Sequence, residues 1–176
     1  MRKSSQQIKY ITVSAMLSAL GVILLAVGAF VEVLDLSTAV FASMLCIYAV
    51  IEIRGSYPWM IWLVTSILGL ILLPIKTPAV FYALFFGFYP ILKEKLEKLP
   101  RLISWILKPV IFHACIALIW GVFKLFIPVA LEEMGGGRML ALLYALALVC
   151  FVLYDIALTR LITFYLFRLR GRFRIK

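Results

Sequence analysis

The single histidine of the chain lies in an apolar segment with other side chains that can contact a ligand. His113, Ala117, Trp120 and Lys124 are spaced at i, i+4, i+7 and i+11, so they share one face of a helix. One interpretation is the wall of an outward-facing pocket, in which Trp120 stacks on a ligand and Lys124 pairs with an anion. In the other, His113 donates one hydrogen bond between helices and Lys124 extends to the membrane surface. Both stay open for His113, and we favour the second for Lys124.

A carboxylate lies deep inside the last apolar segment, and an ammonium group lies inside the segment that also contains His113. Asp155 lies in the cytoplasmic half of the last apolar segment, and Lys108 is expected at a similar depth on the preceding one. If these apolar segments cross a membrane, a lone charge inside the hydrocarbon layer costs free energy. We therefore predict an Asp155–Lys108 ion pair. A proton relay is the alternative, but one isolated carboxylate is thin support for it.

Acidic residues also occur between apolar segments. Glu32 and Asp35 follow the first segment, and Glu132 and Glu133 precede the last. These carboxylates can attract a cationic ligand, or they can cap helices and keep the loops in water. We favour the second interpretation and keep Glu32 and Asp35 as candidate ligand residues.

The fourth apolar segment carries two rows of aromatic side chains, one of which contains Tyr82 and Tyr89. Such rows more often pack than bind. If one of them lines a pocket, we expect the tyrosine row, because a phenol hydroxyl needs a partner or water. Tyr82 is therefore a candidate ligand residue.

Nothing in the sequence indicates an enzyme, a metal site or a bound cofactor. The three cysteines show no CxxC spacing, no glycine-rich phosphate loop opens a helix, and no nucleophile has a recognisable base. The net charge of +10 raises the question of nucleic acid. No soluble module carries that charge, so we expect no nucleic-acid binding.

The residues above must be positioned by membrane helices. Of 176 residues, 65% are hydrophobic and 15% charged, with a mean hydropathy of +1.12. A soluble domain is about 45–50% apolar and about 25% charged. We therefore predict an all-α, single-domain bundle over residues 1–176. Its six transmembrane helices are expected at residues 11–30, 38–53, 57–73, 79–92, 103–127 and 139–167.

Basic residues orient this bundle. Three precede the first segment, one follows the second, four lie between the fourth and fifth, and five follow the sixth. These thirteen basic residues would lie on one side of the membrane, and the loops on the other side contain only Lys76 and Arg138. The bias predicts that both termini are cytoplasmic. The basic tail, residues 168–176, is expected to contact anionic lipids at the cytoplasmic face.

The fourth segment is the shortest. Its 14 residues extend about 21 Å as a helix, less than a hydrocarbon layer of about 30 Å. We expect the span either to include Ile75 to Pro78 as well, or to be a tilted or broken helix.

Ala15 and Ala19 form an AxxxA pattern in the first segment, a shallow strip that another helix can approach closely. That helix can belong to this chain or to a partner. With about 180 residues, six helices, cytoplasmic termini and this motif, the chain resembles the substrate-binding S components of bacterial energy-coupling factor transporters. The resemblance implies a plasma-membrane protein that captures a small molecule for uptake. It also implies that Ala15 and Ala19 dock on a membrane T component, which two ATPase subunits drive.

The ligand class and two other functions remain open. The chain has no asparagine, and its two glutamines are in the N-terminal tail. Amide groups usually orient highly polar ligands, so any ligand is expected to be rather apolar or aromatic. The alternatives are a polytopic scaffold similar to rod-shape-determining membrane proteins, and a lipid-handling protein.

Overall fold

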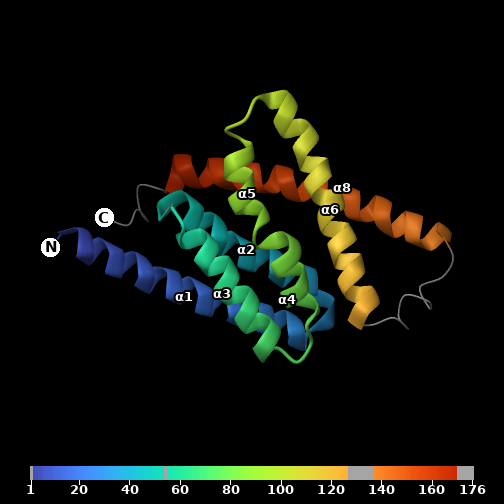
Figure 1. Ribbon diagram of the computed structural model, residues 1–176, viewed down its shortest axis with the longest axis horizontal. Helices are drawn as coiled ribbons and strands as arrows, with labels where there is room; N and C mark the ends of the chain where they lie inside the picture. Colours follow the sequence, from blue (N-terminus) through green and yellow to red (C-terminus); the bar gives the residue numbers. More distant parts are fainter. Residues whose placement is uncertain (1, 54, 127–136, 170–176) are drawn as a thin grey trace. The chain divides into compact units, whose positions relative to one another are not determined.

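The computed structural model describes residues 2–53, 55–126 and 137–169, and these residues contain helices and no strand (Figure 1). They form two compact units. The N-terminal unit ends at Leu107, and the C-terminal unit begins at Lys108. The all-α expectation is confirmed for these residues.

Three helices build most of the N-terminal unit: α1 (Arg2–Phe30), α2 (Asp35–Glu52) and α3 (Tyr57–Leu72), with a short 3-10 turn at Glu32–Leu34. They lie side by side in Figure 1. Leucine, isoleucine and valine dominate them, but their closest contacts use small residues, because a small residue lets two backbones approach. The core includes Leu25, Ala39, Ala42, Cys46 and Ile61.

Gly28 marks a close approach of α1 and α2. A Cβ atom at this position would lie 2.1 Å from Thr38 Oγ1, well inside van der Waals contact. The Thr38 hydroxyl is held there, because it donates to the Leu34 carbonyl at 3.0 Å. Only glycine leaves room for this arrangement.

The fourth predicted segment is broken into three pieces. It consists of α4 (Thr77–Phe81), a π-helical turn (Tyr82–Phe86) and α5 (Tyr89–Leu96). The Gly87 N–H closes the wide turn by donating to the Tyr82 carbonyl at 2.7 Å. On α3, the Trp62 Nε1–H donates to the Ala83 carbonyl at 3.0 Å and so stabilises the turn from outside.

Two long helices form the C-terminal unit: α6 (Arg101–Phe126), whose first turns belong to the N-terminal unit, and α8 (Gly137–Phe164), which continues in a π-helical turn (Tyr165–Leu169). They contact one another where they cross in Figure 1. At this contact Phe112 and Phe151 stack, with ring centroids 4.6 Å apart and planes inclined by 21°. Each ring covers apolar surface of the other helix.

Four helical stretches are long and apolar enough to cross a membrane: Gln6–Phe30, Asp35–Glu52, Ile103–Val122 and Ala141–Arg168. They correspond to the first, second, fifth and sixth predicted spans. Helix α3 has 16 residues and is shorter, and the fourth segment is interrupted. The structure therefore agrees with a membrane protein, whereas the count of six spans stays a prediction.

Candidate functional site

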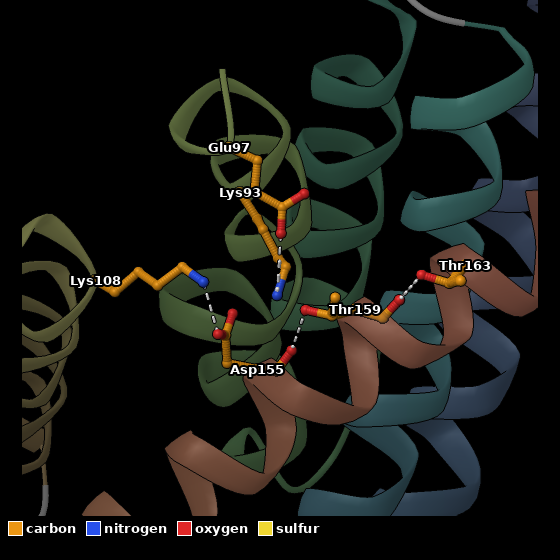
Figure 2. A network of polar contacts seen from close by, with 6 residues as sticks. All are labelled: Lys93, Glu97, Lys108, Asp155, Thr159 and Thr163. Atoms are coloured by element: carbon orange, nitrogen blue, oxygen red, sulfur yellow. Dashed lines mark hydrogen bonds and ion pairs between the residues drawn. The ribbon is translucent and has the colours of Figure 1, made fainter. Parts of the chain in front are cut away.

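An ion pair joins the two helices of the C-terminal unit. Lys108 Nζ on α6 lies 2.7 Å from Asp155 Oδ2 on α8, and the two side chains are only 20% and 18% exposed (Figure 2). The pairing that the sequence predicts is present in the structure. The two opposite charges compensate each other at a depth where an unpaired charge would cost free energy.

Threonines follow Asp155 along α8, but their hydroxyls bond to the backbone. The Thr159 Oγ1–H donates to the Asp155 carbonyl at 2.9 Å, and the Thr163 Oγ1–H donates to the Thr159 carbonyl at 2.8 Å (Figure 2). Because each hydroxyl proton is used by a carbonyl four residues earlier, the row bonds within its own helix. This geometry favours a structural role for Asp155 over a relay of side-chain protons.

A second polar contact crosses from α6 to α8 at His113. The His113 Nδ1 atom lies 2.7 Å from the Pro109 carbonyl oxygen, and His113 Nε2 contacts the Tyr144 hydroxyl. A carbonyl oxygen only accepts hydrogen bonds, so Nδ1 must carry the proton. In the neutral ring, Nε2 then accepts the hydrogen bond of the Tyr144 hydroxyl. The interhelical hydrogen bond that the sequence allowed for His113 is present, but His113 accepts it from Tyr144 instead of donating it.

His113 and Tyr144 are nevertheless exposed, as are Ala117 and Trp120 on the same α6 face. Trp120 is 43% exposed and Tyr144 is 40% exposed. An imidazole, a phenol and an indole therefore remain accessible on one helix pair, and an aromatic or apolar molecule can contact them. The side chain of Lys124, the fourth member of the predicted face, lies outside the described residues.

The acidic candidates are only partly described. Asp35 is the first residue of α2 and is half-buried. A carboxylate in the first turn of a helix is favoured by the positive end of the helix dipole. The N-cap residue of α2 is Leu34, with no side-chain cap hydrogen bond, so capping by Asp35 stays a prediction. The side chain of Glu32 and the residues Glu132 and Glu133 lie outside the described part.

Tyr82 belongs to the core of the N-terminal unit. It is 1% exposed, and its hydroxyl lies 3.2 Å from Cys46 Sγ on α2. Phe85 and Tyr89 are buried with it, and their rings stack with centroids 5.4 Å apart. This placement provides a packing role for the tyrosine row and a partner for the Tyr82 hydroxyl.

The two faces of α1 differ in burial. Ser14, Ser18 and Gly21 are buried, and a Cβ at Gly21 would lie 3.0 Å from Thr65 Cγ2 on α3. Ala15 and Ala19 are exposed. The packing of α1 within this chain therefore uses the neighbouring small residues and leaves the AxxxA strip uncovered.

Several side-chain pairs were not predicted from the sequence. Among them are His113–Tyr144, Lys93–Glu97, whose charged atoms lie 3.5 Å apart (Figure 2), and Lys95–Trp59, in which Lys95 Nζ lies 5.3 Å from the indole centroid. Only Lys93–Glu97 has a local signal, the i, i+4 spacing of opposite charges. The other two join different helices and depend on the fold.

The described residues include no group of three or more histidine, cysteine, aspartate or glutamate side chains that could hold a metal ion. Comparison of the chain with protein-family models, with curated proteins and with solved structures finds no match.

Proposed function

We propose that this chain is the substrate-binding membrane subunit of an energy-coupling factor type transporter in a bacterial plasma membrane. It captures a small, rather apolar or aromatic solute, and partner subunits supply the ATPase activity and the T component. Both termini are cytoplasmic in this proposal, as the thirteen basic residues on one side indicate.

The exposed AxxxA strip carries the proposal. Ala15 and Ala19 lie on a helix long and apolar enough to cross a membrane, and both are uncovered although other small residues of α1 are buried. Membrane helices associate through close backbone approach at small side chains. A strip that this chain does not use for its own packing is therefore available to a helix of the T component.

The C-terminal unit supports the binding part of the proposal. His113, Tyr144 and Trp120 offer aromatic surface with few hydrogen-bonding groups, and Trp120 is 43% exposed. The Lys108–Asp155 ion pair and the Phe112–Phe151 stack hold the two helices that carry these residues. This surface suits a flat, weakly polar ligand that stacks on aromatic rings.

Docking is tested by co-purification with T and ATPase subunits of the source organism. Ala15→Trp and Ala19→Trp place a large side chain on the strip and are expected to abolish recovery of both subunits. Leu20→Trp is the matched control, because Leu20 is 46% exposed on α1 and points away from the strip. Recovery that persists with Ala15→Trp, or is lost equally with Leu20→Trp, contradicts the docking role.

Binding is tested by native mass spectrometry of the intact chain purified in mild detergent. A co-purifying aromatic or apolar molecule, lost in Trp120→Ala, is expected. Capture of a scaffold partner without ATPases, together with no bound small molecule, would overturn the transporter proposal in favour of the scaffold function.

A further inference from the structure

A lysine and a tryptophan meet near one end of the N-terminal unit. Trp59 is the third residue of α3, and Lys95 lies in the last turn of α5. The Lys95 ammonium is 5.3 Å from the centroid of the indole ring, within the range of a cation–π interaction. Lys95 is exposed and Trp59 is half-buried, so the pair is reachable from outside the protein.

The charge of Lys95 differs from that of its neighbours. Lys93 pairs with Glu97 at 3.5 Å, and Lys98 pairs with Glu94 at 2.9 Å. Within the described part of the chain, no carboxylate lies in salt-bridge range of Lys95, and its recorded contact is the Trp59 ring. Lys95 therefore presents a positive charge that the local acidic residues do not neutralise.

Trp59 contacts one other aromatic side chain of its own helix. Its ring meets the Trp62 ring edge-on, with centroids 5.7 Å apart and planes inclined by 88°. Trp62 is itself fixed, because its indole N–H donates to the Ala83 carbonyl. For the Trp59 N–H, by contrast, the described residues contain no recorded acceptor. The pair thus combines a positive charge with an indole donor that is available to an outside acceptor.

Other aromatic residues indicate the level of the membrane surface. Tyr10 on α1 and Tyr57 at the start of α3 meet with centroids 5.7 Å apart, and the exposed Lys9 precedes Tyr10. Tyrosine and tryptophan gather where hydrocarbon gives way to headgroups, and lysines extend toward phosphates there. Tyr57 and Trp59 share the first turn of α3, so Trp59 belongs to the same belt.

We propose that Lys95 and Trp59 form a binding site for the phosphate of an anionic phospholipid headgroup. The ammonium pairs with the phosphate, and the Trp59 N–H donates to an oxygen of the same headgroup. The apolar part of the indole lies against the acyl chains. The proposal requires that the chain spans a membrane, but it does not require a transported solute or partner subunits.

The test uses the intact chain in mild detergent, titrated with phosphatidylglycerol or with phosphatidylcholine of identical acyl chains and followed by native mass spectrometry. We expect tighter binding of phosphatidylglycerol, and a loss of about fivefold in its affinity with Lys95→Gln. Lys95→Arg keeps the charge and is expected to restore binding. Lys98→Gln is the matched control, because that lysine is exposed on the same segment but paired with Glu94.

Trp59→Leu should weaken phosphatidylglycerol binding, whereas Trp105→Leu, at a 79% exposed indole on α6, should not. Equal affinity for the two lipids, or equal losses in Lys95→Gln and Lys98→Gln, would overturn the proposal. Displacement of the lipid by millimolar inorganic phosphate would also overturn it, because the site would then serve a soluble anion. Helical circular dichroism of each variant verifies that a loss of binding is not a loss of fold.

Discussion

The Lys108 ammonium and the Asp155 carboxylate lie 2.7 Å apart between α6 and α8, with about four-fifths of each side chain buried. The attraction between the two charges offsets part of the cost of burying them. Removing one residue takes the ion-pair partner from the other in surroundings that solvate a charge poorly.

Asp155→Leu or Lys108→Met is therefore expected to lower the free energy of unfolding by about 3 kcal/mol. The double variant Lys108→Met with Asp155→Leu should recover most of this loss, because no charge remains unpaired. Thermal unfolding in detergent of the four proteins provides the double-mutant cycle. If the double variant is as unstable as the sum of the single ones, the pair does not stabilise the α6–α8 contact.

The hydrogen bonds of His113 predict its tautomer. Nδ1 faces the Pro109 carbonyl, so it should carry the proton, and Nε2 should accept from Tyr144. Because the chain has one histidine, labelling with 15N-histidine yields an unambiguous pair of ring nitrogen signals. A neutral ring protonated at Nε2 would contradict this geometry.

Tyr144→Phe removes the hydroxyl that bonds to His113 and retains the ring. We expect a small loss of stability, about 0.6 kcal/mol, which is typical of hydrogen bonds between membrane helices. Phe164→Leu on the same helix is a control outside this contact. Thermal unfolding measures both, and an unchanged or higher stability of Tyr144→Phe would show that the hydrogen bond contributes nothing.

Gly28→Ala should destabilise the N-terminal unit. The new methyl group would lie 2.1 Å from Thr38 Oγ1, and α1 and α2 must separate to accommodate it. Overpacking of this kind costs about 1–3 kcal/mol. Gly121→Ala is the matched control, because a Cβ there meets nothing within 4 Å; the better helix propensity of alanine should leave that variant at least as stable.

Trp62→Phe removes the donor that bonds to the Ala83 carbonyl while keeping an aromatic ring on α3. We expect a loss of about 1 kcal/mol from the missing hydrogen bond. Faster amide hydrogen exchange should follow in the π-helical turn at Tyr82–Phe86. Trp105→Phe removes an exposed indole of α6 and should change neither measurement. Unchanged exchange in Trp62→Phe would mean that the turn is stable without this contact.

The sequence alone determines that the chain is helical and apolar enough for a membrane, because long apolar runs leave no other way to satisfy the backbone in lipid. It also predicts the partner of Asp155, since a second charge at matching depth is the cheapest way to compensate the first. The interruption of the fourth segment was expected from its length, because 14 residues are too few to cross the hydrocarbon layer as one straight helix. These features depend on the order and spacing of residues along the chain.

The tertiary structure decides the contacts between helices. Nothing in the spacing of His113 indicates Tyr144, and nothing near Trp59 indicates Lys95. The position of Tyr82 against Cys46 is equally invisible, because it depends on how α2 packs against the broken fourth segment. The residue types thus determine which chemical groups this protein has. Close packing at glycines and hydrogen bonds between helices determine which of those residues contact one another, and whether Ser14 or Ala15 is exposed.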